Sequence, residues 1–357
     1  MILDDLKKIK KLDSKGMIES IEHIYRQCQQ AVEEVRKIKI PRSYAVASDI
    51  IVFGVGGSAL GPRVAQTLFA DSLKLPIEIV RDYSLPAYLG KNSLVILSSY
   101  SGNTEEVLIA AQEVSRRTKK IMAITSGGQL KNLARRKKWP VYLIDPVYNP
   151  CGQPRMAIGY SIMGIVKLLE KTGLIKLSDQ EVKKMISYVA GLNSRFGLKV
   201  KKNNLAKKTA LELHNKIPIF IASEHLVGNA NVAANQINEN GKNLAMFFTI
   251  PEINHHLLEG LSFPKQSKKS FYFIFLNSRF YHPRTQLRYK ITMDILKKRG
   301  YEFTEIKLTG PTKLIQSFET LSLTSYLGFY LAMLNKIDPS PIPWVDYLKK
   351  AIGSDPP

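Results

Sequence analysis

Three hydroxyl side chains, Ser99, Ser101 and Thr104, lie in a short polar stretch that also holds a glycine and an amide. An apolar run of strand type precedes this stretch at residues 93–97, and residues 107–114 carry apolar side chains at helical spacing. A helix N-terminus offers unpaired N–H groups and a partial positive charge, and neighbouring hydroxyls add donors. The turn is therefore predicted to bind a phosphate dianion, although an ordinary helix cap in a serine-rich loop is the simpler alternative.

A second polar run, at residues 235–240, places four amide side chains and the carboxylate of Glu239 in a helix predicted over residues 229–240. Amides at this density can orient a carboxylate, and an apolar site raises the pKa of a carboxyl group. Glu239 is therefore predicted to be a base that also returns its proton. The alternative is that the run is simply the polar end of a helix.

Arg155 and His255 are both predicted at the carboxyl edge of a sheet. Arg155 lies between a Cys-Gly turn and an apolar helix, and its alternative role is a surface ion pair. His255 adjoins His256 after a strand predicted at residues 245–249. Adjacent histidines do not share one helical face and no third ligand has zinc spacing, so a proton-transfer role is predicted for His255 and no metal site is expected.

The elements that position these residues follow from apolar runs that alternate with helical patterns. The predicted strands cover residues 50–53, 77–80, 94–97, 121–125, 141–144, 217–222, 245–249, 271–276 and 303–308. The predicted helices cover residues 17–38, 64–68, 156–174, 229–240, 286–298 and 311–335. Continuous apolar strands between helices indicate parallel sheets covered on both faces. The predicted fold class is α/β, with two doubly wound parallel-sheet (α/β/α) domains in tandem.

The predicted domain boundary follows the helix at residues 156–174. Residues 1–175 would hold an N-terminal helix and the first domain, and residues 176–357 a charged helical bridge at 178–208, the second domain and the C-terminal helices. A chain of 357 residues that is 45% hydrophobic can form two cores.

The chain shows no sign of a membrane or secreted destination. No apolar run reaches transmembrane length, and the N-terminus has acids where a signal peptide needs bases. Cys28 and Cys151 suit neither a disulfide framework nor a metal site, which is typical of a reducing compartment. The protein is therefore expected to be soluble and cytoplasmic, without a membrane partner.

The net charge of +22 raises the question of nucleic-acid binding. The basic clusters are lysine-rich, scattered and not interleaved with aromatic residues, as a single-strand binding surface would be. No specific nucleic-acid partner is therefore expected, and a basic surface that concentrates anionic substrate is favoured.

A dinucleotide site is another alternative, because Gly54, Gly56 and Ala59 follow a strand at the fingerprint spacing, with Asp82 placed to bind a ribose. This alternative leaves the hydroxyl-rich turn at residues 99–104 unexplained. A phosphosugar site would use both turns on one edge of a sheet.

Five motifs occur together in the order and spacing of one protein family. They are Gly56-Gly57-Ser58-Ala59, Ser99-x-Ser101-Gly102-Asn103-Thr104, Gln153-Pro154-Arg155, Gln236-Ile237-Asn238-Glu239-Asn240 and Pro251-Glu252-x-Asn254-His255. From about residue 45 to the C-terminus, the chain resembles the bifunctional phosphoglucose/phosphomannose isomerases, which have two sugar isomerase (SIS) domains. The resemblance implies interconversion of glucose 6-phosphate with fructose 6-phosphate through an enediolate, mannose 6-phosphate as a second substrate, and no metal or redox cofactor.

The resemblance also implies roles for individual residues. The phosphate-binding residues would be Gly57, Ser58, Ser99, Ser101 and Thr104. Arg155 would stabilise the enediolate, Glu239 would move the proton between C1 and C2, and His255 would assist ring opening in the partner subunit's site of a homodimer. A catalytic lysine of the last helix matches Lys349, with Lys350 as the rival.

Two positions depart from the family's pattern. His256 replaces the second asparagine of an Asn-His-Asn sequence, and Ser340 replaces a threonine tied to accepting mannose 6-phosphate. Serine keeps the hydroxyl but lacks the methyl group that packs it, so the resemblance implies mannose 6-phosphate activity less strongly than glucose 6-phosphate activity. A non-catalytic phosphosugar-binding SIS regulator is the alternative, against which the presence of Arg155, Glu239 and His255 argues.

Overall fold

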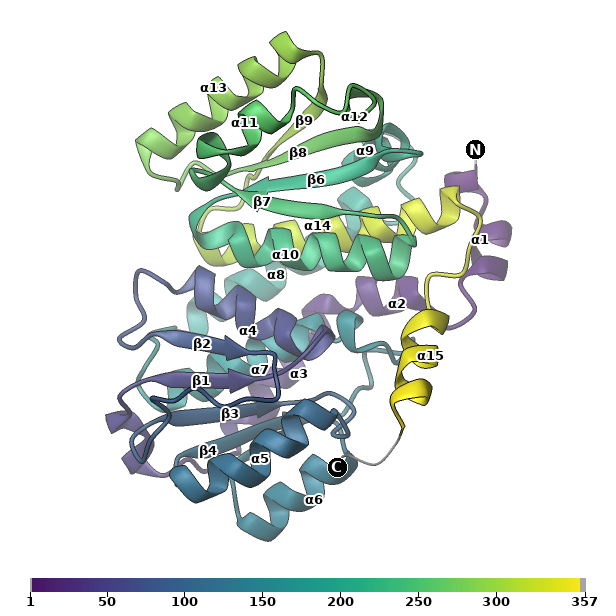
Figure 1. The fold of residues 1–357 in the computed structure, drawn as a ribbon. Coiled ribbons are helices and arrows are strands. Elements are labelled where there is room, and N and C mark those ends of the chain that lie inside the picture. The colour runs from purple at the N-terminus through teal and green to yellow at the C-terminus, as the bar shows by residue number, and fades with distance from the viewer. Residues whose placement is uncertain (1, 354–357) are drawn as a thin grey trace. The chain divides into compact units, whose positions relative to one another are not determined.

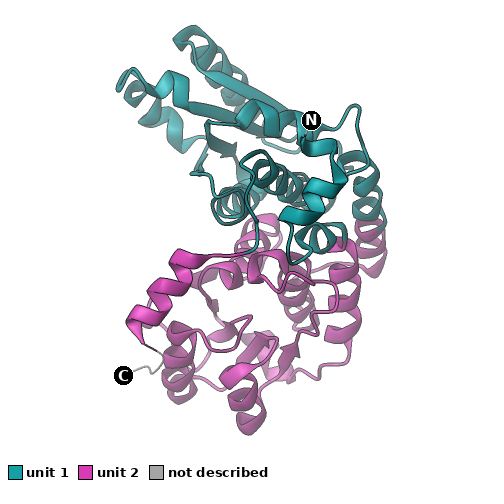
Figure 2. Ribbon diagram, turned by 90° about the vertical axis from the view of Figure 1, so that its right-hand side faces the viewer, with its two compact units in different colours: residues 1–22, 187–340 teal, residues 23–186, 341–357 magenta. Residues whose placement is uncertain are grey.

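The computed structural model describes residues 2–353 and divides into two compact units, which Figure 2 colours separately. Unit 1 comprises Met1–Glu22 and Ser187–Ser340, and unit 2 comprises His23–Ile186 and Pro341–Pro357. Helix α8 (Asp179–Phe196) contributes residues to both units. The domain boundary at residues 175 and 176 stays a prediction, and the two units are described separately below.

Unit 2 is built on a five-stranded parallel sheet in the order β2-β1-β3-β4-β5 (Figure 1). Its strands are β1 (Ile50–Phe53), β2 (Ile77–Val80), β3 (Leu94–Ser98), β4 (Ile121–Thr125) and β5 (Val141–Leu143). Its helices include α3 (Ile24–Arg36), α4 (Gly57–Leu68), α5 (Glu105–Arg117), α6 (Gly128–Lys137), α7 (Ile158–Lys171) and α15 (Pro343–Ile352).

The core of unit 2 explains the uninterrupted apolar runs of its central strands. Every residue of β1, β3 and β4 is buried. Alternate strand residues, such as Ile51 and Val95, share one apolar cluster with α5 and α6, and α4 and α7 lie on the other face with α3 packed on α7. Helices on both faces leave no side of these strands for polar residues.

Unit 1 repeats the plan with a four-stranded parallel sheet in the order β7-β6-β8-β9. Its strands are β6 (Ile217–Ala222), β7 (Met246–Thr249), β8 (Phe271–Asn277) and β9 (Glu302–Lys307). Its helices include α1 (Leu6–Leu12), α2 (Met17–Glu22), α9 (Leu205–Leu213), α10 (Val227–Gln236), α11 (Leu257–Gly260), α12 (Ser267–Ser270), α13 (Pro283–Arg299) and α14 (Lys313–Leu334). The largely buried α14 packs against α9 and α10.

The strands predicted from the sequence are β1 to β9, and the parallel α/β fold class is confirmed. Two predicted helices are interrupted. The helix predicted over residues 17–38 divides at His23 into α2 and α3. The passage at 178–208 divides because the Asn204 amide donates to the carbonyl of Phe196 at the end of α8 and its oxygen caps Lys207 N in α9.

Between residues 2 and 353, none of the helices combines the length and the apolar character needed to cross a bilayer.

Candidate active site

Two adjacent strands of unit 2 bring two strand-to-helix turns to one edge of the sheet. Strands β1 and β3 pair in parallel, with Phe53 opposite Leu97. The turn after β1 leads into α4 at Gly57, and the turn after β3, residues 99–104, leads into α5 at Glu105. In a parallel α/β sheet, ligands bind outside the carboxyl ends of such neighbouring strands.

The hydroxyl groups of the 99–104 turn all make hydrogen bonds within the loop but differ in exposure. The buried Ser99 Oγ accepts hydrogen bonds from Gly102 N (3.1 Å) and Thr104 N (3.4 Å) and lies 2.7 Å from Thr104 Oγ1. Thr104 is the N-cap of α5, yet its side chain makes no capping bond. Ser101 is exposed. The first N–H groups of α5 are thus left uncapped by the Thr104 side chain, close in sequence to the exposed Ser101, as an anion site requires.

Ser58 joins the two turns. Its Oγ accepts a hydrogen bond from Tyr100 N (2.9 Å), and its carbonyl accepts one from Ser98 Oγ (2.9 Å). The hydroxyl of Ser58 is buried at the start of α4, whose N-cap is the glycine Gly56. The two helix N-termini are therefore held together by bonds made through Ser58, and this pair of linked turns is called the cradle below.

Two glycines of the cradle cannot be replaced without displacing backbone. A Cβ on Gly57 would lie 2.9 Å from both Arg155 N and Pro154 Cβ. A Cβ on Gly102, whose φ is +72°, would lie 1.9 Å from Gly127 O. Gly57 thereby lets the Arg155 loop pack directly on the cradle, and Gly102 lets the turn pack on the loop before α6.

Arg155 lies in the interior of unit 2. Its side chain is 1% exposed, in a short 3₁₀ turn (Pro154–Met156), and Nη1 donates to Gln153 Oε1 at 2.8 Å. The alternative that Arg155 is a surface ion-pair arginine is therefore wrong. A buried guanidinium beside the cradle can stabilise developing negative charge more strongly than one in water.

The acidic residues that begin α5 contact a neighbouring tyrosine. The charge of Glu106, followed by burial and by the charge of Glu105, raises the pKa of Tyr83 above its usual value. Both carboxylates therefore have an interaction outside the cradle.

The sequence assigned no role to Tyr100, which lies in the cradle, or to Asn149, which contacts it. The Tyr100 hydroxyl accepts a hydrogen bond from Asn149 Nδ2 (3.0 Å), and its carbonyl accepts one from Ser126 Oγ (2.6 Å). Burial raises the pKa of Tyr100. No sequence signal marked them, because the bond joins residues from separate loops.

In unit 1, Glu239 lies on a π-helical turn, η5 (Ile237–Gly241), that continues α10. The predicted helix is therefore present, but its last turn is wider than an α-helical one. Such π turns are rare and concentrate at functional sites. Glu239 as a residue is half-buried.

The amides around Glu239 also build the local fold. Asn238 forms a two-point contact with the backbone of Ala245, at 3.0 Å in each direction, just before β7. The buried Gln236 Oε1 accepts a hydrogen bond from Ser325 Oγ of α14 (2.9 Å). These bonds fix the π turn to its neighbours and hence fix the backbone that carries Glu239.

His255 ends a 3₁₀ turn, η6 (Glu252–His255), just after β7. It is exposed on its own chain. The neighbouring Asn254 donates to Thr292 Oγ1 (2.8 Å) and accepts from Arg288 Nη1 (3.3 Å), both on α13. These bonds anchor the turn while leaving the imidazole of His255 accessible.

The remaining predicted residues lie near the C-terminus. Ser340 is fully buried in unit 1, and its N–H donates to Asp338 Oδ1 (2.9 Å). Lys349 and Lys350 both lie in the last turn of α15, in unit 2, and both are exposed. Exposure does not distinguish between the two lysines.

The structure thus groups the predicted residues within each unit. Unit 2 brings together the predicted phosphate-binding residues Gly57, Ser58, Ser99, Ser101 and Thr104 with Arg155. Glu239, His255 and Ser340 belong to unit 1. Within residues 2–353, no three His, Cys, Asp or Glu side chains converge as metal ligands would.

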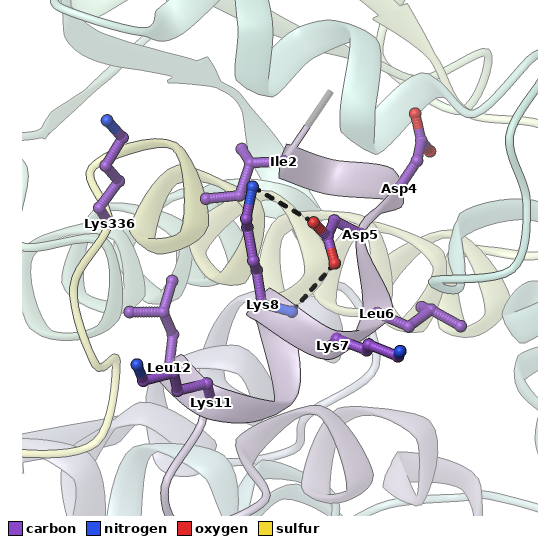
Figure 3. Close-up of a pocket in the computed structure, with 9 residues that line it drawn as sticks. All are labelled: Ile2, Asp4, Asp5, Leu6, Lys7, Lys8, Lys11, Leu12 and Lys336. Carbon is purple, nitrogen blue, oxygen red and sulfur yellow. Dashed lines mark hydrogen bonds and ion pairs between the residues drawn. The ribbon is translucent and has the colours of Figure 1, made fainter.

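One hollow of the structure lies at predicted site residues, and a larger one does not. A small one of about 10 Å³ lies at the cradle and is lined by Gly57, Ser58, Ser98, Tyr100, Ile124, Ile144, Pro154, Ala157 and Ser161. A wide depression of about 1020 Å³ in unit 1 is lined by Ile2, Asp4, Asp5, Leu6, Lys7, Lys8, Lys11, Leu12 and Lys336 (Figure 3). None of the predicted site residues lines the depression, and its four lysines are exposed.

Comparisons with known proteins agree with this architecture. Residues 202–352 match the family model of the bacterial phospho-glucose isomerase C-terminal SIS domain. A bifunctional phosphoglucose/phosphomannose isomerase of Caldicellulosiruptor bescii is 35% identical over 343 residues, which cover 94% of this chain and 99% of that protein. One from Thermoplasma acidophilum is 28% identical, covering 91% of this chain and 98% of that protein.

The fold comparison extends to solved structures. A hypothetical protein from Thermus thermophilus superposes with a TM-score of 0.72 at 16% identity, over 97% of this chain and 93% of that one. Together with the family model, this match confirms the SIS-type fold predicted from the sequence.

Proposed function

Because the chain belongs to the bifunctional phosphoglucose/phosphomannose isomerase family and is a sugar-phosphate isomerase, we propose that it interconverts glucose 6-phosphate and mannose 6-phosphate with fructose 6-phosphate. The reaction moves a proton between C1 and C2 through an enediolate. The non-catalytic regulator is not favoured, because the relatives matched over most of the chain are named as isomerases.

The observation that carries this proposal is the cradle with the buried Arg155 packed against it. In the proposed complex, the phosphate accepts hydrogen bonds from Ser101, Ser58, Ser99 and Thr104 and from the N–H groups that begin α5. The uncapped start of α5 supports this assignment. Binding the unreactive phosphate supplies the energy that positions C1 and C2 for reaction.

Arg155 and Glu239 take the two chemical roles. Glu239 removes the proton from one carbon and returns it to the next, while Arg155 stabilises the negative oxygen of the enediolate. The half-buried Glu239 on a fixed π turn supports the first role, and the 1% exposure of Arg155 supports the second. Charge stabilisation in a water-poor site contributes more to the rate than in bulk solvent.

His255 assists ring opening, and we assign it to the active site of a second copy of the chain in a homodimer. Its exposure on its own chain, beside the anchored Asn254, supports this assignment. Lys349 is the proposed catalytic lysine of α15, with Lys350 as the rival. Ser340 is the proposed determinant for mannose 6-phosphate. Cys28 and Cys151 are buried thiols, which supports the cytoplasmic location.

The experiment that tests the proposal compares Glu239→Gln with the wild-type protein in a coupled isomerase assay. The variant should lose about 10²- to 10⁴-fold in kcat while fructose 6-phosphate still binds. Glu259→Gln is the matched control, because the Glu259 side chain is 94% exposed in the same unit. Full turnover by Glu239→Gln would remove Glu239 from the mechanism.

The shared site can be tested with two inactive variants, Glu239→Gln and His255→Ala. If His255 acts in the partner subunit's site, one of the two sites of a mixed dimer has both residues intact. Equal co-expression should then restore about a quarter of the wild-type activity in a symmetric dimer. No recovery in confirmed mixed dimers would place His255 in the site of its own chain.

A further inference from the structure

A single buried amide connects the cradle with the loop that carries Arg155. Asn149 is 2% exposed, and its Nδ2 donates to the Tyr100 hydroxyl and to the Gln153 carbonyl, both at 3.0 Å. An amide nitrogen has two hydrogens. Asn149 therefore uses both of them to join two loops.

Both partners of Asn149 extend to proposed site residues. The backbone N–H of Tyr100 donates to Ser58 Oγ at 2.9 Å. The side chain of Gln153 accepts a hydrogen bond from Arg155 Nη1 at 2.8 Å. The hydrogen-bonded series Ser58–Tyr100–Asn149–Gln153–Arg155 thus runs without interruption through unit 2.

The Asn149 side chain is itself held in place. The side-chain oxygen Oδ1 accepts a hydrogen bond from Cys151 Sγ (3.3 Å). The backbone carbonyl of Asn149 accepts a hydrogen bond from Gly152 N (2.9 Å). A second rotamer would break the contact to Cys151 as well as the bonds to Tyr100 and Gln153. The position of the amide nitrogen is consequently fixed on both sides.

We propose that Asn149 is a positioning residue that fixes the distance and orientation of Arg155 relative to the phosphate cradle. This inference rests on the proposed function, because it requires the cradle to bind the phosphate and Arg155 to stabilise the enediolate. In the proposed complex, Asn149 itself touches neither the phosphate nor the enediolate. A rigid connection matters because misplacing a stabilising group by about 1 Å can cost about 10²-fold in rate.

The inference is tested with Tyr100→Phe and Asn149→Ala. Tyr100→Phe removes one hydroxyl and keeps the ring, so it should fold even if Asn149→Ala does not. Each variant should lower kcat by about 10- to 100-fold, with KM for fructose 6-phosphate within about threefold of wild type. A merely structural role would lower the thermal midpoint without this selective loss of kcat.

Tyr44→Phe is the matched control. The buried Tyr44 hydroxyl bonds backbone at the opposite, amino end of β4. It lies within donating distance of the carbonyls of Lys119 (3.0 Å) and Ile121 (3.1 Å) and accepts a hydrogen bond from Ile121 N (3.2 Å). It should lose stability as Tyr100→Phe does but keep kcat. The double variant Tyr100→Phe/Asn149→Ala should lose no more kcat than Asn149→Ala alone, because both changes break the same connection.

The results distinguish three cases: no positioning role, a wrong proposed function, and support for both. Wild-type kcat in Tyr100→Phe and Asn149→Ala, or multiplicative losses in the double variant, would overturn the positioning role. An Arg155→Met variant with wild-type kcat would instead overturn the proposed function on which it rests. Loss of kcat in Arg155→Met, together with non-multiplicative losses in the Tyr100 and Asn149 variants, would support both.

Discussion

The two sheets share one strand order but differ at the edge where the ligand is proposed to bind. The order β2-β1-β3-β4 in unit 2 corresponds to β7-β6-β8-β9 in unit 1, so the turns after β1 and β3 correspond to those after β6 and β8. In unit 2 these turns contain glycines and hydroxyls that lead into uncapped helix starts.

In unit 1 the same edge is filled by side chains. Tyr281 is buried after β8, where its hydroxyl donates to Leu276 O (3.0 Å) and accepts from Ser223 N (3.3 Å) at the end of β6. Its ring packs on His225 and Tyr289, with centroids at 5.4 and 5.3 Å. Topology therefore provides two equivalent edges, which differ in the size and polarity of the residues that follow the strands.

The largest effect on activity should come from removing the buried charge of Arg155 beside the cradle. Arg155→Met keeps a long side chain but removes the guanidinium, so kcat should fall about 10²- to 10³-fold, the loss seen when an oxyanion-stabilising group is removed. The measurement is the steady-state rate with glucose 6-phosphate and with mannose 6-phosphate as substrates. Arg195→Met is the control, because Arg195 is half-exposed on α8.

A glycine substitution tests whether the conformation of the cradle depends on its glycines. Gly102→Ala meets Gly127 O at 1.9 Å in a left-handed conformation, so the cradle should distort, and strain at φ > 0 alone costs about 1–3 kcal/mol. Thermal unfolding and KM should both report the loss. Gly191→Ala, with open space around its Cβ and a place within α8, should be neutral or stabilising. Equal stability of the two variants would contradict the close packing.

Matched serines offer a sharper contrast between the edges. Ser101→Ala removes an exposed hydroxyl from the cradle and should raise KM about 10- to 100-fold, since a hydrogen bond to a charged group contributes about 1.5–3 kcal/mol. Ser278→Ala removes a buried hydroxyl that donates to Gln316 Oε1 at 2.5 Å in unit 1. It should lower the stability and leave KM unchanged. A reversed pattern would move the phosphate to unit 1.

The smallest effect on activity is expected from Tyr281→Phe. The change keeps the packed ring but leaves Ser223 N and Leu276 O without the hydroxyl, at a cost of about 1–3 kcal/mol. The free energy of unfolding in urea should fall by this amount while kcat and KM stay unchanged. A raised KM for fructose 6-phosphate would show that the unit 1 edge also takes part in substrate binding.

The sequence predicted the framework well because buried parallel strands leave a strong pattern. Each central strand is an unbroken apolar run, and polar turns such as residues 99–104 follow directly. The roles of hydroxyls within that turn were less accessible. Ser99 and Thr104 bond to each other, and the exposed Ser101 accepts from Asn103 N, an arrangement that residue types alone do not specify.

Other features depend on contacts that no local pattern records. The π turn at Glu239 has the same apolar spacing as an α-helix, so the sequence predicted a helix there. The burial of Arg155 requires the Gly57 backbone to be its neighbour, and the Tyr100–Asn149 bond joins residues 49 positions apart. Such details arise from tertiary packing after the loops have been brought together.

The most direct test of the account is a crystal structure of Glu239→Gln bound to fructose 6-phosphate, in which slow turnover preserves the complex. The account predicts the phosphate in the 99–104 turn, with Ser101 and the first N–H groups of α5 as donors, and the side chain at position 239 within about 3 Å of C1 or C2. A phosphate bound at the β6–β8 edge, or a sugar out of reach of position 239 in every subunit pairing, would contradict it.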